Sequence, residues 1–339
     1  MTIKNKEYSF LSSNGIDEIY SLVFMPTNAR YRGYLQFLHD KYDHIDRYEE
    51  VMTFFATRGY VCIGHDYMGH GRSVKTGETP GHFLGEYPEI RLIDDTNHVF
   101  QLIQQDIPIS TTKIQNSNSS DSAGQEKCPI LHGLIGMGFG ATIAKLAILK
   151  YPNVNMVVLC GDKGPDAFAK FISSYCKNRI RKDGDKAFLP ILERRLEGKY
   201  NKFVDDSLNG IEWRTRDSKQ IARITQDRLC SFHYTAGAYR AMFEMEKMCG
   251  SSSWFKAFPK YLALYIIAGG YDPVSNYTRN LMPMISKLKQ NGTRNAFYKF
   301  YDDARHELFF EINRHQVLTD VLRFIQIVEE QQLKQSQAG

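Results

Sequence analysis

The segment 130–152 constrains the fold more than any other part of this 339-residue chain. It reads ILHGLIG, then MGFG, then ATIAKLAILKYP, which is an apolar run, a turn with glycines at 136, 138 and 140, and a helical pattern. A sharp turn from a strand into a closely packed helix needs residues without a Cβ. The segment therefore predicts a strand, a tight turn and a helix in direct succession.

Short β-rich runs alternate with helical patterns along most of the chain. This alternation is typical of an α/β fold in which helices cover both faces of a mostly parallel sheet. The first two strands precede any helix and predict an antiparallel hairpin that leads into the sheet. The predicted strands are 19–25, 33–39, 60–66, 130–136, 154–159, 264–268 and 297–301, and the predicted helices are 47–58, 90–105, 139–151, 277–289 and 311–330.

Two segments interrupt the alternation. Residues 110–127 are rich in Ser, Asn and Gln, so we expect a disordered surface insertion there. The region 163–259 has amphipathic helical patterns and no strand-like run, which predicts a helical cap inserted between two strands of the core. The expected organisation is a core of residues 1–162 and 260–338 with the cap above it.

Composition and charge exclude several classes of protein. A formal net charge of +5 without clustered Lys and Arg argues against nucleic-acid binding. The six cysteines form no C-x-x-C pair, and we expect neither a metal site nor a cofactor. The first residues lack the apolar core of a signal peptide, and no run of 18 apolar residues occurs. We therefore expect a cytoplasmic protein without an integral membrane segment.

Four sequence motifs, together with the turn at Gly138, resemble the motifs of one protein family. The sequence GGYDPV follows the strand 264–268, and ARHE follows the strand 297–301; the others are HDKYDHIDRY from residue 39 and DYMGHGRS from residue 66. The chain is similar in these motifs to the α/β-hydrolase superfamily, in particular its monoacylglycerol lipase, lysophospholipase and S33 serine aminopeptidase group. The resemblance spans nearly the whole chain.

The resemblance implies an α/β-hydrolase fold and a small acyl-ester or lipid-like ligand, such as a monoacylglycerol or lysophospholipid. It implies Gly138 as the position of the nucleophile, Asp272 as the acid and His306 as the catalytic histidine. By the same match, the backbone N–H groups of Lys41 and Phe139 would bind the oxyanion.

Three positions depart from the family pattern at this site. Gly138 stands where the family has the nucleophilic serine, Met137 where it usually has histidine, and Asp40 where it has the glycine of the oxyanion loop. Glycine offers no oxygen nucleophile, so acyl-enzyme catalysis should be weak or lost. Unless its side chain turns toward solvent, Asp40 also places a carboxylate beside the expected oxyanion, where it would oppose the developing charge.

Several functions remain open from the sequence. The chain is either a weakened hydrolase or a non-catalytic pseudoenzyme that binds a lipid-like ligand or a protein partner. His306 and Asp272 either hold two loops together or activate a water molecule, and Cys160 is a conceivable substitute nucleophile. The basic run 177–186 would allow peripheral membrane contact, although a solvated surface is the commoner meaning. Structural hydrogen bonding is the favoured role for His39, His44 and His70.

Overall fold

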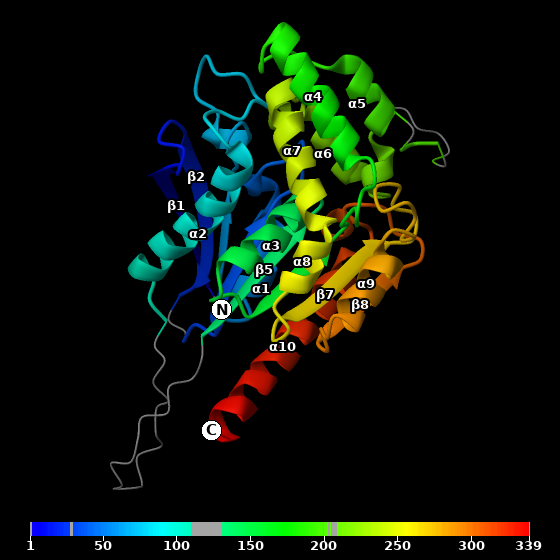
Figure 1. The fold of residues 1–339 in the computed structure, drawn as a ribbon. Coiled ribbons are helices and arrows are strands. Elements are labelled where there is room, and N and C mark those ends of the chain that lie inside the picture. Colours follow the sequence, from blue (N-terminus) through cyan, green and yellow to red (C-terminus); the bar gives the residue numbers. More distant parts are fainter. Residues whose placement is uncertain are drawn as a thin grey trace, which may run out of the picture.

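An eight-stranded sheet forms the centre of the protein (Figure 1). The computed structural model describes residues 2–27, 30–109, 130–198, 200–202, 204 and 209–338. The strand order is β1-β2-β4-β3-β5-β6-β7-β8; β2 pairs antiparallel with β1 and β4, and all other neighbours are parallel. The strands are β1 (Ile3–Leu11), β2 (Glu18–Pro26), β3 (Gly33–Leu38), β4 (Tyr60–His65), β5 (Leu131–Met137), β6 (Met156–Cys160), β7 (Ala263–Gly269) and β8 (Ala296–Tyr301).

Helices cover both faces of the sheet, so its central strands are apolar on both sides. In β6, Val157 and Leu159 belong to the core layer under α2, α3 and α9, whereas Met156 and Val158 belong to the layer under α1 and α10. This alternation follows from the two-residue period of a strand. The helices are α1 (Glu49–Ala56), α2 (Pro88–Asp106), α3 (Phe139–Lys150), α9 (Leu281–Gln290) and α10 (Arg314–Ala338).

The chain between β6 and β7 adds a helical layer above one end of the sheet (Figure 1). Within it, α4 packs along α7. The backbone N–H of Glu307, just beyond β8, donates to the carbonyl of Arg214 in this layer over 2.7 Å, so the layer is fixed to the core next to His306. Its helices are α4 (Ala169–Asp183), α5 (Pro190–Glu197), α6 (Ser218–Gln226), α7 (Ala236–Cys249) and α8 (Ser252–Ala257). The short 3-10 helices of the described chain are η1 (Ile45–Tyr48), η2 (Gly71–Ser73), η3 (Glu212–Arg214), η4 (Arg228–Cys230) and η5 (Leu308–Phe310).

The structure corrects the predicted hairpin and one helix start. Strand β2 does not pair with β3; it lies between β1 and β4. Helix α9 begins at Leu281 and not at 277, because Asn276, Tyr277 and Thr278 have left-handed backbone conformations that end regular helix geometry. The insertion predicted at 110–127 lies outside the described residues. Within the described chain, every helix is too short or too polar to cross a lipid bilayer.

Candidate functional site

The carboxyl ends of four parallel strands bring the predicted site residues together. Asp40 follows β3, Gly138 follows β5, Asp272 follows β7 and His306 follows β8. Parallel strands present these ends at one edge of the sheet, which is where α/β proteins form their sites. The structure thus assembles side chains that lie up to 266 positions apart in the sequence.

The turn after β5 has the geometry that the sequence predicts. Gly138 has φ of +53°, a left-handed conformation that favours glycine, and α3 begins at the next residue. A Cβ on Gly140 would overlap the carbonyl of Leu38, so the close approach of α3 to β3 also requires glycine. The backbone N–H of Phe139 points into the site from the first position of α3, and its donor meets a carboxylate there.

That carboxylate belongs to Asp40, which does not turn toward solvent. The residue is only 2% exposed. Its Oδ1 accepts the N–H of Phe139 at 2.6 Å, and its Oδ2 lies 2.9 Å from Nε2 of His306. In the family pattern, an oxyanion would accept the first hydrogen bond and a serine hydroxyl would make the second. The Asp40 carboxylate therefore occupies both places.

Gly138 and Asp40 fit each other sterically. A Cβ at position 138 would overlap the carboxylate of Asp40 far inside van der Waals contact. A serine at position 138 consequently requires the Asp40 carboxylate to leave this position and give up its contacts with Phe139 and His306. A Gly138→Ser substitution alone would therefore meet the Asp40 carboxylate at the site.

His306 is held between two carboxylates. It is 1% exposed, and its Nδ1 lies 3.1 Å from Oδ1 of Asp272. Burial lowers the pKa of His306, but the charge and hydrogen bond of Asp272, followed by the hydrogen bond and charge of Asp40, raise it to about 10. At neutral pH the ring is an imidazolium with both N–H groups donated. Both ring nitrogens thus lie within hydrogen-bond distance of a carboxylate, and neither is left free to contact a water molecule.

The Asp40 carboxylate stays ionised in this setting. Burial raises the pKa of Asp40, but the hydrogen bond and charge of His306, with smaller contributions from Lys41 and the Phe139 N–H, hold it below its usual value. The three groups thus form an alternating array of carboxylate, imidazolium and carboxylate. The array carries one net negative charge, and both imidazole nitrogens have a carboxylate partner, so the ring has no free acceptor.

A cavity of about 40 Å³ adjoins Asp40, Gly138 and His306. A buried water needs roughly 10–15 Å³ of such space, and ligand pockets are about 300–1,000 Å³, so this volume suits a few water molecules. Lys41 and Lys163 line this cavity, and each is paired with a glutamate: Lys41 with Glu197 at 2.6 Å, and Lys163 with Glu246 at 2.8 Å. Further wall residues come from the helical layer, among them Leu196, Tyr200, Tyr239, Met242 and Phe243.

Sequence reasoning missed the residue that anchors the His306 loop. Glu307 is fully buried and pairs with Arg47, 2.9 Å away, and with Arg214. Arg47 also pairs with Asp43 at 2.7 Å. These ion pairs join three segments around the site. Glu307 directly follows His306 in the sequence, but its partners Arg47 and Arg214 lie 260 and 93 positions away, so the sequence does not show these pairs.

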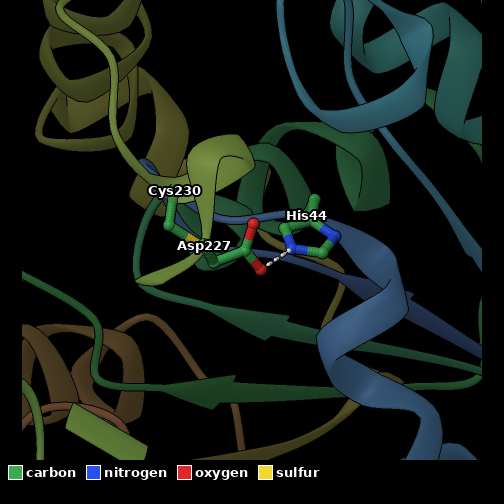
Figure 2. A group of neighbouring side chains, drawn as sticks. All are labelled: His44, Asp227 and Cys230. Atoms are coloured by element: carbon green, nitrogen blue, oxygen red, sulfur yellow. Dashed lines mark hydrogen bonds and ion pairs between the residues drawn. The ribbon is translucent and has the colours of Figure 1, made fainter. Parts of the chain in front are cut away.

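The remaining candidates have other surroundings. His39 accepts the N–H of Tyr67 at 3.3 Å, and Nε2 of His70 lies 2.7 Å from the hydroxyl of Tyr234. Cys160 is fully buried, and burial raises the pKa of its thiol, so it does not present a thiolate to the site. Among the described residues, one group has the side chains and spacing to hold a metal ion. It contains His44 and lies apart from the site at Gly138 and His306 (Figure 2).

The sheet order, the turn at Gly138 and the placement of Asp272 and His306 define an α/β-hydrolase-fold protein. The sequence pattern of the family described as Serine aminopeptidase, S33 matches residues 29–313. The chain belongs to this family. A search of curated proteins gave no match.

Solved structures of esterases and lipases share the fold over almost the whole chain. A thermostable carboxyl esterase from Bacillus coagulans in complex with glycerol aligns with a TM-score of 0.84 at 21% identity, over 97% of this chain and all of its own. A soluble variant of monoglyceride lipase from Saccharomyces cerevisiae aligns with a TM-score of 0.66 at 13% identity, over 92% of each chain. The monoacylglycerol lipase of Paleococcus ferrophilus gives 0.59 at 13% identity, over 97% of this chain and 99% of its own.

Proposed function

We propose that this chain is a non-catalytic member of its family with respect to acyl esters, and that it acts by binding. The observation that carries the proposal is the position of the Asp40 carboxylate, between the Phe139 N–H and His306. Acyl transfer requires a nucleophile, a free base and an empty oxyanion site. Gly138 supplies no nucleophile, His306 is protonated, and Asp40 fills the oxyanion site.

A protein partner is favoured over a lipid-like ligand. The cavity of about 40 Å³ at the site is far smaller than an acyl chain needs, and two lysines that are paired with glutamates line it. The helical layer instead exposes aromatic side chains. Phe168 and Phe171 are 69% and 70% exposed, and Tyr175 follows one turn further along α4. Their spacing of three and four residues places them on one side of the helix, which is typical of an interaction surface.

The test is a set of four proteins assayed for hydrolysis of a short-chain aryl ester and a monoacylglycerol. These are the native chain, Gly138→Ser, Asp40→Gly and the double variant Asp40→Gly/Gly138→Ser, each checked for folding by circular dichroism. We expect the first three proteins to hydrolyse the esters no faster than the uncatalysed background. The double variant restores a hydroxyl, frees the Phe139 N–H and should exceed the native protein by at least about 10²–10³-fold, the value of one oxyanion donor.

The control adds His306→Ala to the double variant, which should abolish the gained activity if it uses the predicted base. Hydrolysis by the native protein that His306→Ala removes would overturn the proposal. Equal activity of Gly138→Ser and the double variant would contradict the steric role assigned to Asp40.

A further inference from the structure

A second group of chemically active side chains lies between the loop after β3 and the helical layer. A ring nitrogen of His44, a carboxylate oxygen of Asp227 and the sulfur of Cys230 lie within 4.8 Å of one another. Figure 2 shows the three side chains converging, with Nε2 of His44 and Oδ2 of Asp227 2.8 Å apart. Imidazole, carboxylate and thiolate are the side-chain ligands that zinc uses in proteins.

The local backbone fixes this arrangement. Asp227 caps η4 by accepting the N–H of Leu229 at 2.9 Å, and the N–H of Cys230 donates to the carbonyl of Asp227 at 3.1 Å. In a 3-10 turn, side chains three residues apart lie on the same side. On the core side, the N–H of His44 donates to Oδ1 of Asp43 at 2.9 Å. The three side chains are therefore positioned by their own turns.

The charges around this group are compatible with a bound divalent cation. Arg47 and Arg214 lie near Cys230, but Asp43 and Glu307 pair with them. Asp227 and a Cys230 thiolate would then balance two positive charges. Burial raises the pKa of the Cys230 thiol to about 12, so the metal-free thiol is protonated and a bound ion would displace its proton to solvent.

We propose that His44, Asp227 and Cys230 bind a Zn²⁺-class ion whose fourth ligand is water. Zinc bonds of about 2.0–2.3 Å place tetrahedral ligands roughly 3–4 Å apart, so shifts of about 1 Å complete the site. The Asp227 side chain is 30% exposed and lines, with His44, a cavity of about 860 Å³ through which an ion can enter. The ion would tie the loop that carries Asp40 to the helical layer.

The sequence did not predict this site. Asp227 lies 183 positions beyond His44, and no spacing of cysteines or histidines marks the group. The inference is independent of the proposed function, because metal binding is measured without an ester substrate.

The test uses the full chain after removal of metals with a chelator. Titration with Co²⁺ should reach one equivalent and produce the absorption of a thiolate-to-cobalt charge transfer, which Zn²⁺ then abolishes by displacement. Cys230→Ser should remove this absorption, and Asp227→Asn should weaken Zn²⁺ binding by at least about tenfold in calorimetry. Cys176→Ser, at a buried cysteine of α4 outside the group, and His233→Gln, at an exposed histidine, are the matched controls and should bind as the native protein does.

The absence of saturable binding, or a charge-transfer band that survives Cys230→Ser, would overturn the inference. If circular dichroism shows that Cys230→Ser does not fold, X-ray absorption at the zinc edge of the native protein decides. One sulfur among nitrogen and oxygen ligands supports the site, and a shell without sulfur refutes it.

Discussion

The buried His306 should make stability depend on pH over a range where few native histidines titrate. Its pKa is about 10 in the folded protein and near 6.5 in an unfolded chain. Because the folded value is the higher one, the folded state holds the proton more tightly. The stabilisation is therefore fully present below about pH 6.5 and is lost as pH rises through 10.

The difference between these two values corresponds to about 5 kcal/mol, since each pKa unit contributes about 1.36 kcal/mol. Almost all of it should disappear between pH 6.5 and pH 10. Urea unfolding followed by tryptophan fluorescence measures the free energy of unfolding at each pH. The variant His306→Gln lacks the titrating imidazole, so the native-minus-variant difference in the free energy of unfolding should fall by several kcal/mol across this range, while the ionisations of groups that do not contact His306 cancel.

An NMR titration measures the pKa of His306 directly from the chemical shift of its Cε1 proton. This signal is assigned by its absence in His306→Gln. Asp40→Asn keeps the shape of the side chain and removes one of the two negative charges, so it should lower the measured pKa and move the loss of stability to lower pH. A native His306 that titrates at or below 6.5, or a stability difference constant from pH 6.5 to 10, would refute the assignment of an imidazolium between two carboxylates.

Three further expectations follow from burial and pairing. Glu307→Ala should cost about 3–5 kcal/mol in urea unfolding, because it leaves Arg47 and Arg214 buried without their shared partner, and a loss under about 1 kcal/mol would contradict this. Cys160 should resist iodoacetamide in the native protein at pH 8, as followed by mass spectrometry, whereas rapid labelling would show that its thiol is accessible. Phe171→Ser should change the free energy of unfolding by less than about 0.5 kcal/mol, because the ring is mostly exposed; a larger loss would mean that it packs in the fold.

The parallel part of the fold could be predicted because its strands are buried on both faces. Strands β6 and β7 are continuous apolar runs, and β5 is interrupted only by His132; each appears in the sequence within about two residues of its observed bounds. Strand β1 gave no such signal. It lies at the edge of the sheet, most of its residues are exposed, and the run Lys4 to Glu7 reads as a polar segment. Without β1, the predicted hairpin paired β2 with the wrong neighbour.

The order of the candidate site residues along the strands was predictable, but the arrangement of their side chains was not. Gly138, Asp272 and His306 follow strands in a recognisable order, and the structure brings them to one edge of the sheet. The direction of the Asp40 side chain depends on how the loop after β3 lies against the start of α3, 99 residues later. A sequence reading could not decide between solvent and the oxyanion site, because the partners of a single carboxylate have no periodicity that marks them.

The steric fit between Gly138 and Asp40 affects which substitutions could restore the family's residues at this site. Restoring a serine while Asp40 remains forces its Cβ into the carboxylate, and overpacking of this kind costs about 1–3 kcal/mol or more. Removing the carboxylate while Gly138 remains takes away a hydrogen-bond partner of the Phe139 N–H and of His306 without supplying a nucleophile. We therefore expect either single step toward the family pattern to be unfavourable and to give no ester hydrolysis. Contacting residues of this kind can couple strongly, so we expect the family's chemistry to return only when both positions change together.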